Sequence, residues 1–338
     1  MFTREKIMEN MILRPNIKKI DKEVIKRILL EAGIKNNISH IDEPNVWVMQ
    51  SHRIYLTDGG RLLLKIGINP DWTDSSTILN QVKATELINS TGIKQPKILS
   101  FSENEDKYGF KYILSESQRG TRFCDEYKKA SKNEREKLYK SLGQAYSLIH
   151  NIKNKWSGVW DGDIHKKKYP IHPADFYRNA EIYGGSNKHL VESNIISDNV
   201  FERICLAWDE NLSYLKQRPT SLIHISPFPW SIYMIRENEE YSVGGFSALA
   251  DFMWWDPMSD VAHLIYPPYL NITKEEQDAF ISEYDIPLDE RAINLYMILN
   301  RLCAMSGCYL APVKSKEANL WIHNEVKSIE KALNKLGF

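Results

Sequence analysis

The sequence predicts an α+β protein made of two unequal lobes. Extended, β-branched runs are concentrated before residue 116, whereas after residue 131 most apolar residues recur at helical spacing. One short hairpin, at residues 233–246, interrupts the helical part. Separate groups of strands and helices are typical of an α+β arrangement. A chain of 338 residues is long enough for two lobes, which we place at residues 1–116 and 117–338.

The first lobe is predicted to be mainly an antiparallel sheet. Asp21 can cap a first helix, and Gly33 marks its end. An Asp58-Gly59 turn between two apolar runs is the pattern of a hairpin. The expected elements, in chain order, are a helix at residues 21–32, strands at 46–49, 53–56 and 61–66, a helix at 77–90, and strands at 95–99 and 111–116.

Helix signals dominate the second lobe. Ser131 and Glu134 have the spacing of a capping box, and the helix that follows ends near His150. Residues 153–173 are polar and rich in Trp, Gly and Lys, which favours a surface loop. Further helices are expected at residues 176–183 and 200–214, after the capping box at Thr273, and at the C-terminus, where Ile322, Val326, Ile329, Leu333 and Leu336 form an apolar stripe.

The composition argues against several classes of partner. The formal net charge is +0, so a surface for nucleic acid is not expected. No run of 18 apolar residues and no apolar signal region occur, which predicts a cytoplasmic protein with no membrane segment. The four cysteines form no Cys-x-x-Cys pair, so no metal site is expected from them. The classes of partner that the composition leaves open are a small-molecule ligand and a protein.

One stretch, residues 221–235, has the layout of a phosphotransferase catalytic loop. Such loops contain His-x-Asp, four further residues and Asn; the Asp positions the attacking hydroxyl and the Asn holds a metal ion. Here His224 is in place, but Ser226 stands at the Asp position and Ser231 at the Asn position. The rest of the chain can be interpreted as the scaffold of this loop.

With these pieces in order, residues 45–284 resemble the aminoglycoside phosphotransferase and choline-kinase-like family, which has the protein-kinase-like fold. The run from Asp58 to Lys65 is similar to the family's ATP-lysine strand, and Leu142 to His150 is similar to its Leu-Gly … Leu-His helix. Trp255-Asp256-Pro257 followed by Asp260-Val261-Ala262 resembles the segment after the metal site. The resemblance implies a bilobal kinase-like fold and a cofactor edge made of Lys65, Gln81 and Glu116.

The residues that would carry the chemistry depart from the family pattern. Counting back eight residues from Asp256 puts Ala248 where the family has its second metal-binding Asp. The carboxylate that pairs with the ATP lysine is expected near Gln81, which cannot form an ion pair; Glu86 would serve only if the register slipped by about one helical turn. Serine is a poor Mg²⁺ ligand and no base at neutral pH. The first hypothesis is therefore a pseudokinase whose cleft binds a ligand or a partner and needs neither ATP nor metal.

In that hypothesis the cleft is lined by Lys65 and by four aromatic residues, whose alternative role is to fill the core. These four are Phe228, Trp230, Trp254 and Trp255.

Two other hypotheses stay open. Asp251, in Asp251-Phe252-Met253, could be a relocated metal ligand of a working ATP- and Mg²⁺-dependent phosphotransferase, although that register needs a three-residue deletion downstream. Alternatively, the cleft could host a different reaction with Ser226, His224 and Asp251 as a triad. The sequence lacks a Gly-x-Ser-x-Gly elbow, and Pro227 removes an N–H from the loop.

Overall fold

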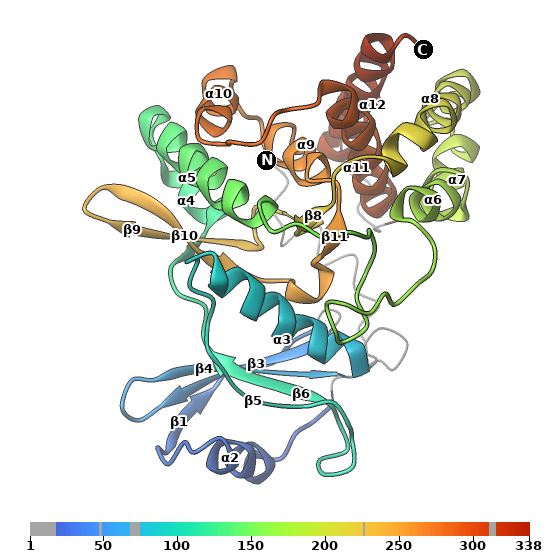
Figure 1. Cartoon of the computed structure of the whole chain (residues 1–338). Coiled ribbons are helices and arrows are strands. Elements are labelled where there is room, and N and C mark those ends of the chain that lie inside the picture. Colours follow the sequence, from blue (N-terminus) through green and yellow to red (C-terminus); the bar gives the residue numbers. More distant parts are fainter. Residues whose placement is uncertain (1–17, 47–48, 68–74, 226, 311–315) are drawn as a thin grey trace.

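The structure, a computed structural model, describes residues 18–46, 49–67, 75–225, 227–310 and 316–338. It confirms the predicted α+β, bilobal, kinase-like architecture. An antiparallel sheet forms the smaller lobe, and helices form most of the larger one (Figure 1). The division into domains at residue 116 stays a prediction. Within the described residues, no helix is both long enough and apolar enough to cross a bilayer.

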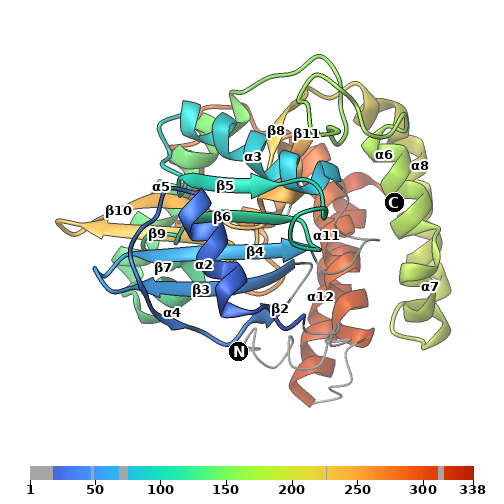
Figure 2. The same cartoon turned by 90° about the horizontal axis from the view of Figure 1, so that it is seen from below.

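The sheet of the smaller lobe has the strand order β1-β3-β4-β6-β5, with β2 paired to β3. All of its pairings are antiparallel. Helices α2 and α3 lie on opposite faces of this sheet (Figures 1 and 2). The bounds are α2 Lys22–Glu31, β1 Ile38–Ile41, β2 Asn45–Val46, β3 Met49–Leu56, β4 Arg61–Gly67, α3 Ser75–Ser90, β5 Ile98–Ser102 and β6 Tyr112–Glu116.

Two details of this lobe differ from the sequence prediction. The runs at 46–49 and 53–56 were expected as separate strands, but Met49–Leu56 is one continuous strand, because polar residues such as Gln50 and His52 are buried within it. Strand β1 was not predicted, since its sequence Ile-Ser-His-Ile is short and half polar.

Alternation along β4 decides which side chains face the cleft. Leu62, Leu64 and Ile66 are buried in the core that includes Ile28 of α2. Successive side chains of a strand point to opposite faces, so Lys65 emerges on the face away from α2. The apolar pattern of this strand therefore positions its one lysine.

The larger lobe surrounds two small sheets with helices. The order β10-β9-β7 forms one sheet, and β11 pairs with β8 in the other. The bounds are β7 Thr121–Arg122, α4 Phe123–Lys129, α5 Lys132–His150, α6 Pro173–Tyr177, η1 Arg178–Ile182, α7 Gly185–Glu192, α8 Asp198–Lys216, β8 Ser221–Ile223, β9 Ile232–Glu237, β10 Glu240–Phe246, η2 Leu249–Asp251, β11 Met253–Trp255, α9 Met258–Ile265, α10 Lys274–Ser282, α11 Glu290–Leu310 and α12 Lys316–Leu336.

The predicted hairpin is present in this lobe. Tyr241 pairs with Arg236 and Val243 with Met234. The turn contains two residues, Asn238 and Glu239, which both have positive φ. Glu240 begins β10 directly after this turn.

Two other predictions for this lobe need correction. The helix expected at residues 176–183 is the end of α6 followed by a turn of π-helix, η1. Residues 153–173 were expected to be a surface loop, but Trp160 in this segment is fully buried against Trp254. The mostly polar composition of residues 153–173 gave no indication that Trp160 anchors this segment in the core.

Candidate functional site: the interlobe cleft

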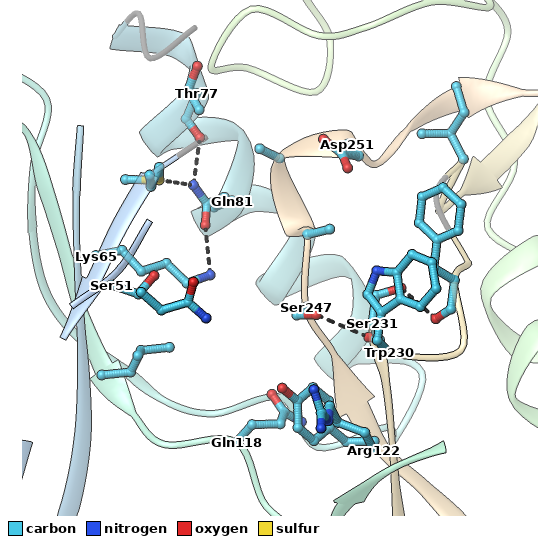
Figure 3. A pocket seen from close by; sticks show the side chains of 18 of the residues that line it. Ser51, Lys65, Thr77, Gln81, Gln118, Arg122, Trp230, Ser231, Ser247 and Asp251 are labelled. Carbon is cyan, nitrogen blue, oxygen red and sulfur yellow. Dashed lines mark hydrogen bonds between the residues drawn. The ribbon is translucent and has the colours of Figure 1, made fainter. Parts of the chain in front are cut away.

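A cleft of about 1070 Å³ lies between the two lobes. Its small-lobe wall includes Leu63 and Lys65 of β4 and Gln81 of α3. Its large-lobe wall comes from the loop before β9, from η2, and from one face each of α9 and α11. Figure 3 shows Lys65 and Gln81 on one side of this space and Trp230 on the other. The predicted cleft thus brings together residues that lie far apart in the sequence.

Lys65 faces a neutral partner. Its Nζ lies 3.4 Å from Oε1 of Gln81. The Gln81 amide is held from its other end, where Nε2 donates to Sδ of Met49 at 3.2 Å. Burial lowers the pKa of Lys65, and the charge of Asp251 acts in the opposite direction. The position expected for the lysine's counter-charge therefore holds an amide.

The other two residues considered for the cofactor edge lie elsewhere. Glu86 forms an exposed ion pair with Lys83 on α3, so no register slip brings it to Lys65. Glu116 ends β6 and donates its backbone N–H to the carbonyl of Lys97. The lining of the cleft contains the next two residues, Ser117 and Gln118, rather than Glu116.

His224 anchors the loop and is inaccessible. Its Nε2 lies 2.9 Å from the carbonyl of Ser247, its Nδ1 lies 3.1 Å from the Tyr146 hydroxyl, and its ring stacks on Phe252. Burial lowers the pKa of His224 to about 4. Because both ring nitrogens are engaged by protein groups, the imidazole is poorly placed to act as the base of a triad with Asp251.

Asp260 is a residue whose role the sequence analysis missed. Its carboxylate accepts the backbone N–H of His224 at 2.6 Å and that of Ile225 at 2.9 Å, and it lies 3.2 Å from Nε2 of His150. Ile225 has a positive φ of 56°, which is unusual for a β-branched residue. Asp260 thus holds a strained loop in place. The sequence feature that could have indicated this role is its position in the Asp-Val-Ala segment that follows Asp256-Pro257.

The positions expected to bind metal hold no suitable ligand. The Oγ of Ser231 donates to the carbonyl of Phe228 at 2.8 Å, which closes the loop on itself. Ala248 lies in the left-handed region with φ of 58° and presents only a methyl group to the cleft. Ser226 lies outside the described residues.

Asp251 is the predicted acidic candidate that the structure does place in the cleft. It ends the 3-10 turn η2, is exposed, and lines the space that Lys65 enters (Figure 3). Asn and Asp tolerate the left-handed region better than Ala. The sequence nevertheless has Ala at position 248, where that backbone occurs, and its acid three residues later.

Two of the four predicted cleft aromatics form a stacked pair on the large-lobe wall. Phe228 and Trp230 are 4.9 Å apart between ring centroids and nearly parallel. Tyr269 extends the wall, with its ring 5.2 Å from that of Trp230. Tyr269 was missed because it follows two prolines in a segment without periodicity.

Trp254 and Trp255 were also expected in the cleft, and their positions differ. Trp254 is absent from its lining: the side chain is buried, and Nε1 donates to the carbonyl of Ile164. Trp255 is almost fully buried but touches the inner end of the cleft, where it stacks with Tyr177. Adjacent strand residues point to opposite sides, so only one of them could face the cleft.

The fold is shared with phosphotransferases of known structure. No protein-family model and no curated protein matches the chain. The GDP complex of aminoglycoside 2'-phosphotransferase-IIIa superposes with a TM-score of 0.62 at 11% identity, over 94% of this chain and 100% of that one. A thermostable aminoglycoside phosphotransferase APH(4)-Ia, in ternary complex with AMP-PNP and hygromycin B, gives 0.60 at 14% identity, over 92% and 99%.

The chain has the fold of the aminoglycoside phosphotransferases. At this level of identity the likeness concerns the fold, and the chemistry has to be argued from the residues.

The phosphotransferase fold implies a magnesium nucleotide beside Lys65, and the residues present do not fit one. Mg²⁺ requires several hard oxygen ligands in near-octahedral geometry. Ala248 offers none, and Ser231 offers only a neutral hydroxyl, which is a weak ligand for Mg²⁺. In the part of the chain that the structure describes, no group of three His, Cys, Asp or Glu side chains could hold a metal ion. Among the described residues that line the large-lobe wall, Asp251 alone supplies a carboxylate.

Proposed function

We propose that this chain is a phosphotransferase-fold protein that no longer transfers phosphate and instead binds a small-molecule ligand or a protein partner. The observation that supports this most directly is Ala248. It occupies the sequence position of a metal-binding Asp, and it faces the cleft with a methyl group. Nucleic acid is not among the proposed partners, and a cytoplasmic location is part of the proposal.

Two further features agree with loss of transfer. Lys65 faces the amide of Gln81 instead of a carboxylate. Ser231 stands where an Asn would hold metal. Groups that neutralise charge and position the nucleophile act together in phosphoryl transfer, so losing several of them costs most of the catalysis.

The cleft itself persists, which supports a binding role. Its volume of about 1070 Å³ is slightly above the usual range of roughly 300–1,000 Å³ for small-molecule sites. Aromatic rings line one wall, and the opposite wall has Lys65. Biosynthesis or resistance involving a small molecule is the setting we propose.

Titration calorimetry with ATP, with and without Mg²⁺, tests this proposal. The unmodified protein is expected to show no Mg²⁺-dependent ATP binding. The triple variant Ser226→Asp, Ser231→Asn and Ala248→Asp is expected to gain it, because two metal ligands and the base position return together. Ser226→Asp alone is the control and should gain nothing. Tight Mg²⁺-dependent binding by the unmodified protein would contradict the proposal.

A second candidate function is favoured by one observation, the charge of Asp251 acting on Lys65 across the cleft. If Asp251 has taken over a metal-binding role, the protein is an active ATP-dependent phosphotransferase. Asp251→Asn then abolishes both Mg²⁺-dependent ATP binding and turnover. If the proposed function is correct, the unmodified protein has neither Mg²⁺-dependent ATP binding nor turnover, so Asp251→Asn changes neither of them.

A further inference from the structure

The inner end of the cleft contains polar side chains that the proposed loss of phosphotransfer does not explain. Ser259 and His263 lie one helical turn apart on α9, and Asn300 and Cys303 lie one turn apart on α11. All four line the cleft. We call this set the α9/α11 subsite.

Among the described residues of this subsite, His263 has the most polar atoms without a hydrogen-bond partner. Its side chain is 5% exposed, and neither ring nitrogen has a hydrogen-bond partner among the described residues. A buried polar group without a partner costs free energy, so such groups in native proteins usually meet protein, water or a ligand. His263 lines the cleft, although both ring nitrogens are covered in this structure. A ligand can therefore supply a partner once the ring rotates toward the cleft.

The side chain of His263 is uncharged at neutral pH and has both a hydrogen-bond donor and an acceptor. Burial lowers its pKa to about 4. At neutral pH the imidazole therefore presents one N–H donor and one nitrogen acceptor. Asn300 adds a donor, since its Nδ2 is buried and has no partner in the described part of the chain. A ligand with several hydroxyl groups can donate to the acceptor nitrogen with one of them and accept from Asn300 or the imidazole N–H with another.

The aromatic wall adjoins this polar pair directly. The ring of Phe228 contacts His263 edge to face, with 4.9 Å between centroids, and stacks on Trp230. A ligand that reaches His263 therefore passes beside flat aromatic surface. Aromatic side chains favour the faces of planar rings and the C–H faces of sugars.

The charge of the wall argues against a polycation. The described lining of the cleft has more cationic than acidic side chains: Arg53, Arg61, Lys65 and Arg122 against Asp42, Glu43 and Asp251. Selective binding of a polyamine or an aminoglycoside needs several acidic groups to offset its charges. Next to the α9/α11 subsite, Leu299 and Ala304 are apolar, and one carboxylate, that of Glu181, accepts from Sγ of Cys303.

We propose that the α9/α11 subsite binds an uncharged, hydroxyl-bearing ring, with His263 and Asn300 hydrogen-bonding to its hydroxyls and Phe228 and Trp230 contacting its face. The inference rests on the proposed binding function and names its ligand class. Both a neutral sugar and a hydroxylated aromatic ring have this chemistry.

Ligand-observed NMR and tryptophan fluorescence titration on the full chain test the subsite. The probes are methyl β-D-glucopyranoside, catechol and phenyl β-D-glucopyranoside; anisole lacks hydroxyls, and kanamycin is a polycation. At least one hydroxylated neutral probe is expected to bind more tightly than both anisole and kanamycin. Comparison of the glucoside with catechol distinguishes a sugar from an aromatic ligand. Binding by none of the three, or tighter binding by kanamycin, overturns the inference.

Variants separate a ligand role from a structural one. His263→Leu should weaken the best probe by about tenfold or more and leave thermal stability equal or higher, because it removes unpartnered buried polar atoms. Asn300→Leu tests the same subsite from the other helix if His263→Leu fails to fold. His189→Leu, outside the cleft lining, is the matched control. Unchanged probe affinity in the folded subsite variants overturns the inference.

The two proposals can fail separately. Phosphate transfer by the unmodified protein would overturn the proposed function and leave the probe data intact. Absence of probe binding would overturn the subsite and leave the loss of transfer untouched.

Discussion

At the scale of single residues, Ala248 holds an unfavourable backbone conformation at the centre of the cleft. A left-handed conformation costs a non-glycine residue about 1–2 kcal/mol. Ala248→Gly is therefore expected to stabilise the fold by ~1 kcal/mol, after allowing for the greater freedom of unfolded glycine. Urea denaturation measures the change. Ala250→Gly is the control: Ala250 has no positive φ, and the same replacement there should destabilise. A destabilising effect at both positions would contradict this explanation.

The buried histidines predict how stability depends on pH. His224 and His263 have folded pKa values of about 4, below the ordinary value of 6.5, because burial disfavours their charged forms. Between about pH 6.5 and pH 4 the unfolded chain therefore binds more protons than the folded chain. Stability is expected to fall as pH decreases through this window, and to be unaffected by these two groups above it.

His263→Leu tests that pH dependence. The variant should lose less stability than the unmodified protein between pH 7 and pH 5, as measured by urea denaturation at each pH. Replacement of the exposed His323 by Leu controls for the removal of one histidine. Equal slopes for the His263 variant and the unmodified protein would show that His263 does not contribute.

At the scale of elements, helix α12 is predicted to be essential for the larger lobe. Leu333 is fully buried in its apolar stripe, and α12 packs on α11. Leu333→Asp should destabilise the protein by several kcal/mol, because it buries an unpaired carboxylate. Leu320→Asp on the same helix is the matched control, since Leu320 is 62% exposed. A melting temperature that is unchanged in the Leu333 variant would mean that α12 is not docked.

The elements also show what the sequence could predict. Periodicity and caps identified the helices after Asp21, Ser131 and Thr273, and the structure confirms all three caps. Those signals are local. The continuity of β3 depends instead on burying Gln50 and His52. Gln50 bonds to the backbone N–H and carbonyl of Lys18, 32 residues earlier, and the sequence pattern does not indicate such a partner.

The candidate site likewise has some features that the sequence could predict and others that it could not. The family resemblance implied that Gln81 lies beside Lys65, and the two side chains do meet. The α9/α11 subsite could not be predicted, since His263 and Asn300 are 37 positions apart and each lies in an apolar stretch. Trp254 and Trp255 could not be told apart until the direction of β11 was known.

At the scale of the whole molecule, the fold of a phosphotransferase is retained while several of the positions expected to hold the reaction's groups are occupied by other residues. The lobes, the cleft and the lysine are all present. In the proposed function, Ser231, Ala248 and Gln81 stand where an active enzyme would have metal ligands and a counter-charge. Function resides in such sites and not in the fold.

A phosphate-transfer assay tests this central claim most directly. Purified protein is incubated with Mg²⁺ and γ-labelled ATP and a panel of aminoglycosides, choline-like alcohols, amino sugars and neutral glycosides, beside the Lys65→Ala and Asp251→Asn variants. We predict label transfer no greater than background for the unmodified protein, and no difference among the three proteins. Transfer to any acceptor by the unmodified protein that is lost in both variants would contradict the claim, and would make Asp251 the relocated metal ligand.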